Sequence, residues 1–389
     1  MNKWLQSVIG MLQKPQVLWW GYGIVAVLTA VQRMAIGFDE KGYSRYENYR
    51  IFKFSWHYFI AGENPYTGHP ETWDLFKYSP AFSVTMAPFY AVPDVIGLPV
   101  WNLLNALPLL AALLVLPGIT PVRRCYMAWL VLPELIISLQ NTQSNGLMAA
   151  LMIWTYIALA REKPFAAAGY VMAGVFIKIF GVFAALTALF YRSQWRVFIP
   201  ALIGWGIFWA LFPVVFSGWP HLKQLYEWWW MLLRDDHAAS VGLSVSGWME
   251  TWFGWMPDKS MITIMGLLLQ AGAVVLDVRR NKSPLYTLAS LLIWVVIFNH
   301  KAESPTFIIA FCGVAIWYFM QEKPSAGAKW ATGIAFFLGS VTPTDLFPPA
   351  WYHHIIQPFT LKAVPFIGIW TWLMIKAFRN EQRINLEVS

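Results

Sequence analysis

Acidic side chains are concentrated in one polar stretch, residues 38–80, which separates two long apolar runs. A carboxylate at such a place can take a proton from an attacking hydroxyl group, as a general base does. Each of these groups could instead be an ordinary loop carboxylate paired with a basic neighbour. As a set they favour chemistry, and the candidate catalytic residues are Asp39, Glu47 and Asp74.

Cationic side chains also occur where the surrounding sequence is apolar. The segment Asn299–Glu303 contains His300 and Lys301 and lies between two apolar runs, and Lys178 has apolar residues on both sides. An ionisable group at membrane depth is costly, so it suggests a functional site. His300, Lys301 and Lys178 could bind a phosphate group and stabilise its charge as it leaves. Alternatively, these long side chains could reach back to the lipid headgroups.

Two further polar groups could hold a sugar. The run Gln140–Asn145 carries amides that can hydrogen-bond sugar hydroxyls but can equally cap helix ends. Asp236 and His237 closely follow a run of tryptophans, whose faces suit both sugar rings and the membrane interface. The candidate substrate-binding residues in these groups are Gln140, Gln143, Asp236 and His237.

The composition is that of a membrane protein. The 389 residues are 58% hydrophobic and 12% charged, whereas soluble domains carry about 25% charged residues. Many apolar runs are about 15 to 20 residues long, which is near the length needed to cross a bilayer. We therefore predict an all-α polytopic protein with about 10–12 membrane segments, including re-entrant or broken helices, and a large first external loop. The runs are continuous, which argues against a membrane β-barrel.

Several other classes of protein are disfavoured. The net charge is +8, but the basic residues form short clusters between apolar runs, which indicates membrane orientation and not a nucleic-acid partner. The two cysteines lie in or beside apolar runs, so a disulfide framework is not expected. We find no phosphate-binding loop, dinucleotide fingerprint or nucleophile elbow, and no metal-ligand spacing. No cofactor and no metal are expected.

The chain reads as a single membrane domain over residues 1–389. The first external loop covers 37–78, the second external loop 217–260, and a basic cytoplasmic tail 376–389. Lys3 and Lys14 precede the first apolar run, so the N-terminus is also predicted to be cytoplasmic. The polar segments then fall on one face, which is the strongest functional argument that the residues provide on their own.

Two segments allow more than one topology. Residues 121–140 contain Pro133 and Glu134, which could break the helix or make it re-entrant. Residues 165–190 have basic residues at both ends, so a helical hairpin with Lys178 near its tip is favoured over one span.

The first loop also carries a family resemblance. Its motifs are Asn-Tyr-Arg-Ile-Phe from Asn48, Ala-Gly-Glu-Asn-Pro-Tyr ending at Tyr66, and Tyr-Ser-Pro from Tyr78. Together they resemble the first-loop pattern of membrane glycosyltransferase family 87, in which G-x-N-P-Y precedes Y-x-P at the start of the second span. The Gln140–Asn145 turn, Lys178 and the Arg192–Arg196 stretch follow in the same order. The resemblance implies a GT-C fold, and it adds Asn48 and Tyr66 to the candidate substrate-binding residues.

One position departs from the family pattern. Where the family usually places its loop aspartate, this chain has Asn48, which cannot act as a base. The role would pass to Glu47, to Asp39 or to Asp74, and Asp39 ranks first because Asp39 and Glu40 resemble the acidic pair of other GT-C enzymes.

The resemblance implies a glycosyltransferase of the bacterial inner membrane whose site faces the periplasm. It would transfer a hexose, mannose or a relative, from a polyprenyl-phosphate carrier to a glycan or glycolipid acceptor, with inversion at the anomeric carbon. The expected partners are the lipid-linked donor, the acceptor and the bilayer, without nucleic acid. The alternatives are a transporter or flippase for lipid-linked glycans, which should show inverted repeats that we do not find, and an inactive scaffold of a glycan-assembly complex.

Overall fold

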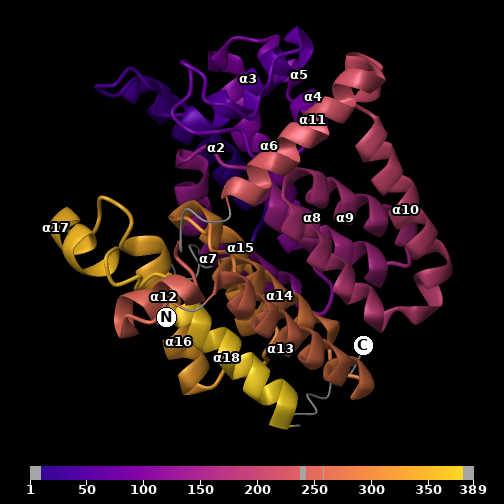
Figure 1. The fold of residues 1–389 in the computed structure, drawn as a ribbon. Coiled ribbons are helices and arrows are strands. Elements are labelled where there is room, and N and C mark those ends of the chain that lie inside the picture. Colours follow the sequence, from indigo (N-terminus) through magenta and orange to yellow (C-terminus); the bar gives the residue numbers. More distant parts are fainter. Residues whose placement is uncertain (1–9, 237–241, 257, 380–389) are drawn as a thin grey trace.

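The computed structural model describes residues 10–236, 242–256 and 258–379. Over these residues the regular structure is helical, and the β-pairing is one isolated antiparallel bridge between Phe38 and Ser44. Figure 1 shows most of the helices gathered into a bundle, with α3, α4 and α5 together at one end. The prediction of an all-α polytopic membrane protein is confirmed.

Most of the helices follow the apolar runs of the sequence. In the first half they are α2 (Pro15–Ile36), α3 (Glu47–Ala61), α4 (Pro80–Thr85), α5 (Ala87–Tyr90), α6 (Asp94–Leu114), α7 (Pro121–Gln140), α8 (Asn145–Ala160), α9 (Pro164–Ile177) and the 3-10 helix η1 (Ile179–Phe190). In the second half they are η2 (Arg192–Gln194), α10 (Trp195–Leu211), α11 (Val214–Asp236), α12 (Val245–Phe253), α13 (Lys259–Arg279), α14 (Pro284–Ile297), η3 (Ser304–Thr306), α15 (Phe307–Phe319), α16 (Ala326–Phe336), the π-helix η4 (Phe337–Val341), α17 (Pro349–Trp351), the π-helix η5 (Tyr352–Ile356) and α18 (Val364–Arg379).

Few of the apolar helices are long enough to cross a membrane alone. Within the described ranges, α2, α6 and α13 meet that criterion, and α10 with α11 forms one further pair that is bent by 85°. Five shorter apolar helices accompany them: Asn145–Ala160, Pro164–Ile177, Ile179–Phe190, Pro284–Ile297 and Ser304–Phe319. The predicted 10–12 segments therefore correspond to a mixture of full spans and shorter helices, because turns and charged residues interrupt the runs before about 20 residues.

Small residues let the central helices approach closely. A Cβ atom at Gly313 of α15 would lie 2.5 Å from the Ala289 carbonyl oxygen of α14, so this position has no room for a side chain. Leu288, Leu292 and Phe311 are fully buried around this contact. Close backbone approach at small residues is the usual way in which membrane helices gain packing energy.

The segment 165–190 forms the predicted hairpin. Lys178 separates α9 from η1, and the two arms touch near the tip, where a Cβ atom at Gly181 would lie 2.6 Å from the Gly174 carbonyl carbon. At the other end, the Gln194 amide donates to the Leu159 carbonyl at 2.8 Å, close to where α9 begins. The basic residues at the two ends of the segment therefore lie on the same side of the bundle.

Helix α7 is continuous, so of the alternatives for residues 121–140 the structure does not adopt a break at Pro133. The helix runs from Pro121 to Gln140 with Pro133 inside it. A proline is tolerated in a membrane helix when neighbouring groups satisfy the freed backbone. Glu134 is accommodated because a lysine from a distant segment pairs with it, as described below.

The two ends of the bundle differ in chemistry. At one end, named the basic end, arginines bind the carbonyls at helix C-termini: Arg123 binds Gln321, Arg124 binds Leu114 at 3.3 Å and Arg280 binds Ala377 at 2.5 Å. A cation at a helix C-terminus satisfies orphan carbonyls and complements the helix dipole. The other end, named the site end, carries the turn between α7 and α8.

The first loop folds onto the site end through an aromatic cluster. Phe52 of α3 packs edge-on against Phe82 of α4 and Trp101 of α6, at centroid distances of 5.4 and 5.5 Å. Helix α11 lies against the same cluster, because the Trp229 indole donates to the Lys77 carbonyl at 3.2 Å. In Figure 1, α11 crosses diagonally from this end toward the middle of the bundle. The predicted second loop thus consists largely of the helices α11 and α12.

Candidate functional site

The site end is organised around the turn Gln140–Asn145 between α7 and α8. Three consecutive backbone carbonyls of the turn accept side-chain donors from elsewhere: Gln140 from Arg33, Asn141 from Asn48 at 2.9 Å, and Thr142 from Trp101 at 2.9 Å. Thr142 has a φ of 51°, in the left-handed region, so the turn is held in a conformation that a threonine rarely adopts. Hydrogen bonds from side chains of α2, α3 and α6 therefore fix this turn in place.

Gln143 connects the first loop to the segment after α14. Its side chain is mostly buried. Its amide oxygen lies 3.5 Å from the Tyr78 hydroxyl, and its amide nitrogen lies 3.5 Å from Glu303 Oε2. Both contacts are long, but they place three polar groups from distant parts of the chain side by side.

Lys178 enters the same group from the hairpin tip. Its ammonium donates to Asn145 Oδ1 at 2.6 Å and lies 5.8 Å from the centre of the Tyr78 ring. The hairpin tip is also held by Ser79, whose hydroxyl donates to the Phe176 carbonyl at 2.5 Å. A cation fixed in this way between an amide and an aromatic face can stabilise a negative charge brought beside it.

Glu303 marks the start of a tightly anchored segment. It begins the 3-10 turn η3, where it shares a reciprocal cap with Thr306. The next residue, Ser304, accepts a hydrogen bond from Lys362 Nζ at 2.9 Å. Lys362 in turn lies 2.7 Å from Glu134 Oε1, and the other oxygen of Glu134 accepts from Ser340 at 2.9 Å. The position of Glu303 is therefore set by a buried network beneath it.

The three predicted catalytic carboxylates lie in separate surroundings. Asp39 accepts hydrogen bonds from the backbone amides of Lys41 and Tyr43, both at 2.9 Å. Asp74 pairs with Lys77 at 3.2 Å. These two groups thus hold local turns of the first loop.

Glu47 is buried, with 6% of its surface exposed. Its two oxygens accept from the Ser44 hydroxyl and the Trp73 amide, both at 3.0 Å. Burial raises the pKa of Glu47, because removal from water disfavours the charged form more than these hydrogen bonds favour it.

The predicted phosphate ligands other than Lys178 lie close to Glu303 in the sequence. His300 and Lys301 are half-buried in the turn that follows α14, and the Lys301 amide donates to Asn299 Oδ1 at 3.0 Å. They belong to the same short connection as Glu303.

The remaining predicted substrate ligands are dispersed. Asn48 binds the turn itself, and the Gln140 amide donates to Gln32 at 2.9 Å on the exposed side. Tyr66 is buried in the aromatic cluster, 5.6 Å from the ring of Phe76. Asp236 is the last residue of α11, and His237 lies outside the described residues.

The structure thus joins two predicted residues, Gln143 and Lys178, with Tyr78, Asn145 and Glu303. The sequence placed Lys178 in an apolar run and the other four in polar segments or motifs, and it gave no reason to single out Tyr78, Asn145 or Glu303. It missed Lys362 altogether, because this residue lies within what reads as the last apolar span. The position of Glu134 could have been used, because a carboxylate inside an apolar run requires a partner and therefore predicts a buried cation nearby.

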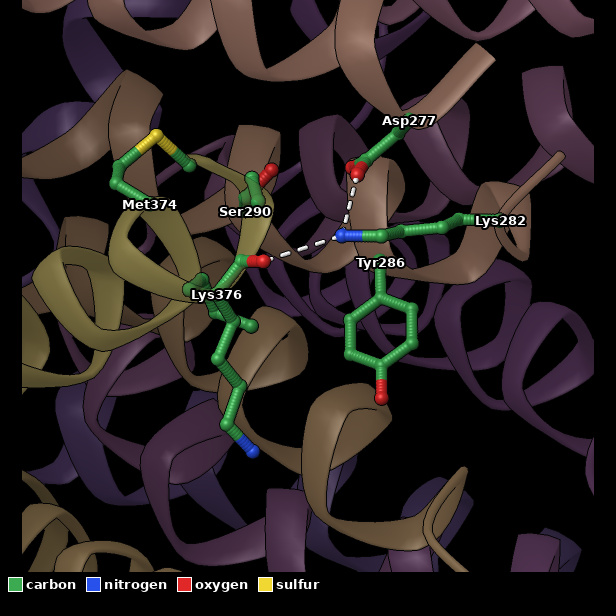
Figure 2. A pocket seen from close by; sticks show the side chains of 8 residues that line it. Asp277, Lys282, Tyr286, Ser290, Met374 and Lys376 are labelled. Atoms are coloured by element: carbon green, nitrogen blue, oxygen red, sulfur yellow. Dashed lines mark hydrogen bonds and ion pairs between the residues drawn. The ribbon is translucent and has the colours of Figure 1, made fainter. Parts of the chain in front are cut away.

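A small pocket lies at the basic end, away from these residues. Figure 2 shows Lys282 between the Asp277 carboxylate, at 3.3 Å, and the Lys376 carbonyl, at 3.2 Å. These contacts join the turn before α14 to the end of α18, so they have a clear structural role. Within the described part of the chain, no group of three or more histidine, cysteine or acidic side chains could hold a metal ion.

The arrangement at the site end pairs a fixed cation with a carboxylate, separated by hydroxyl and amide groups. Such a set can hold a phosphate on one side and a hydroxyl group on the other.

A comparison with protein-family models matches residues 76–302 to the model for glycosyltransferase family 87. The matched region begins after the G-x-N-P-Y motif and includes Tyr78, Gln143, Lys178 and His300. The comparison with curated proteins finds no match. Because the family model covers more than half of the 389 residues, the chain belongs to glycosyltransferase family 87 and is a membrane glycosyltransferase.

Proposed function

We propose that this enzyme transfers a hexosyl group, mannose or a relative, from a polyprenyl-phosphate carrier to a hydroxyl group of a glycan or glycolipid. A donor with a lipid tail would explain why the polar site lies at the end of a membrane bundle. The observation that carries the proposal is Lys178, which lies at the tip of an apolar hairpin, 2.6 Å from Asn145 Oδ1. A lysine at this place suits the phosphate of a lipid-linked donor, as a point charge.

The reaction is a single displacement. A carboxylate at the site end takes the proton of the acceptor hydroxyl, whose oxygen attacks the anomeric carbon. The bond from that carbon to the phosphate oxygen breaks, and the lipid phosphate leaves with the electron pair, so the configuration inverts. Lys178, with His300 and Lys301, stabilises the departing phosphate. Candidate bases from the first loop are Asp39, Glu47 and Asp74.

Sugar recognition is assigned to the amides and aromatic groups of the site end. Gln143 is the best placed, because it lies between Tyr78 and Glu303. Asn48, Tyr66, Gln140, Asp236 and His237 complete the proposed substrate-binding set. Because basic residues favour the cytoplasmic side of a membrane, the basic end would face the cytoplasm. The site end would then face the periplasm of a bacterial inner membrane.

The test is direct. Purified protein in lipid is incubated with a panel of radiolabelled polyprenyl-phosphate sugars and a membrane extract as acceptor. Label that moves from one donor into a new product supports the proposal and names the sugar. Folded protein that transfers label from none of the donors contradicts it and favours transport or a scaffold role.

A further inference from the structure

The first-loop carboxylates are already used by the fold. Asp39 closes a turn, Asp74 pairs with Lys77, and Glu47 is buried under two hydrogen bonds. Asn48 lies beside Glu47 but carries an amide, which donates to the Asn141 carbonyl and cannot take a proton. A base that serves an incoming hydroxyl needs a carboxylate that the substrate can reach.

Glu303 also caps a turn, through its reciprocal contact with Thr306, but it is the exposed one among these four carboxylates. Its side chain is exposed, and it lies at the site end next to Gln143, whose amide nitrogen is 3.5 Å from Glu303 Oε2. Lys178 lies in the same group, with its ammonium 5.8 Å from the centre of the Tyr78 ring and 2.6 Å from Asn145 Oδ1. The carboxylate and the cation therefore flank the same pair of groups, Tyr78 and Gln143.

The anchoring of Glu303 also suits a reacting group. Its segment is fixed by the reciprocal cap with Thr306 and by the hydrogen bond from Lys362 to Ser304. A catalytic group contributes most when its position is set before the substrate arrives. The Glu134–Lys362 pair beneath the segment provides such support without touching the substrate.

We propose that Glu303 is the catalytic base of this glycosyltransferase. The proposal rests on the proposed function. The Glu303 carboxylate takes the proton of the acceptor hydroxyl as the acceptor oxygen bonds to the anomeric carbon. The bond to the phosphate oxygen breaks, the lipid phosphate leaves beside Lys178, and the proton on Glu303 then passes to water.

The test compares Glu303→Gln with wild type in the transfer assay. Glutamine keeps the size and an acceptor oxygen, so it can preserve the cap with Thr306, but it cannot take the proton. We expect kcat to fall about 100-fold or more, the lower end of what a general base contributes. The KM for the donor should change little, and Glu303→Asp should retain more activity than Glu303→Gln. Glu63→Gln, an exposed change in the first loop, is the matched control and should behave as wild type.

A pH profile separates a base from a structural residue. In wild type, kcat should fall as the pH is lowered and the base becomes protonated, and this acidic limb should disappear in Glu303→Gln. The proposal is overturned if Glu303→Gln transfers sugar at the wild-type rate, or if it is slower but keeps the same acidic limb. Loss of activity in Asp39→Asn, Glu47→Gln or Asp74→Asn alone would assign the base to the first loop. Under any of these outcomes, sugar transfer by the wild-type enzyme would still support the proposed function. A wild-type enzyme that transfers no sugar would contradict both the proposed function and the role of Glu303.

Discussion

Lys362 Nζ lies 2.7 Å from Glu134 Oε1, and both side chains are almost fully buried, with 3% and 0% of their surfaces exposed. The two residues are 228 positions apart in the sequence. Ser340 donates to the other oxygen of Glu134, Ser304 accepts from Lys362, and the Phe307 ring lies 5.3 Å from the ammonium. The pair thus joins α7, η4 and η3 to the segment before α18, directly beneath Glu303.

Removing one partner of this pair should cost far more stability than removing both. Lys362→Met leaves an uncompensated buried carboxylate, for which a loss of about 3 to 5 kcal/mol is typical. The double variant Glu134→Met with Lys362→Met should recover most of that loss, because two buried charges are replaced by apolar groups of similar size. Melting curves in detergent measure both effects.

The control for that experiment is the exposed pair Lys223–Glu227, whose atoms are 3.8 Å apart. Lys223→Met should change the stability by less than about 1 kcal/mol, as is usual for surface pairs. A Lys362→Met variant that melts like the Lys223→Met control would show that the buried pair does not stabilise the fold.

The course of the main helices was predictable because it depends on local composition. The apolar runs predicted membrane helices, among which α2, α6 and α13 are long enough to cross a bilayer, and the basic residues at both ends of 165–190 predicted the hairpin. Helix α7 was harder, because Pro133 and Glu134 both argue for a break when the partner of Glu134 is unknown. That partner is 228 positions away, and no local pattern reveals it.

The candidate site was predictable only in part, for the same reason. The sequence of a polar segment shows which reactive types of residue it contains. It does not show which of these side chains lie next to one another in the folded protein. Gln143 was selected as a sugar ligand, whereas its structural importance is that it contacts both Tyr78 and Glu303. The first-loop carboxylates looked alike in sequence, and they differ through burial and hydrogen bonding that depend on the folded loop.

The hairpin makes a prediction about membrane sidedness. In a background with Cys125→Ala and Cys312→Ala, single cysteines at Lys163 and Ser193 should react with an impermeant thiol reagent from the same side of the membrane. Both positions are exposed, at the two ends of the hairpin. A cysteine at the exposed Thr67 of the first loop should react from the opposite side. Labelling of the first two positions from opposite sides would instead indicate one full span.

Lys178 should affect the chemical step more than folding. Lys178→Met removes the charge that faces Asn145 and the Tyr78 ring but keeps an apolar stem of similar length. We expect kcat for transfer to fall about 100-fold, as when one preorganised stabilising group is removed from a developing anion. The melting temperature should stay close to that of wild type, because no buried partner charge is left alone by this change.

Transfer assays and melting curves on the same preparations check the Lys178 prediction. Lys223→Met, which removes an exposed lysine from α11, is the matched variant and should transfer normally. If Lys178→Met and wild type transfer sugar at equal rates, Lys178 does not stabilise the departing phosphate.

Glu47 and Glu71 should shift stability with pH in opposite directions. Burial raises the pKa of Glu47, so the folded protein binds this proton more tightly than the unfolded chain does. The stability from its neutral form is present at low pH and is lost as the pH rises through the folded pKa. Glu47→Gln mimics the neutral form, so its melting temperature relative to wild type should increase from about pH 4 to pH 7.

Glu71 provides the comparison of opposite sign. The Tyr58 hydroxyl donates to its carboxylate and lowers the pKa of Glu71, so the stability it contributes is present at neutral pH and is lost as the pH falls through the folded pKa. The melting temperature of Glu71→Gln relative to wild type should therefore be lowest at neutral pH and should recover on acidification. Parallel melting curves of the three proteins across this pH range measure both trends. If the two variants follow the same trend, the assigned environments of these carboxylates are wrong.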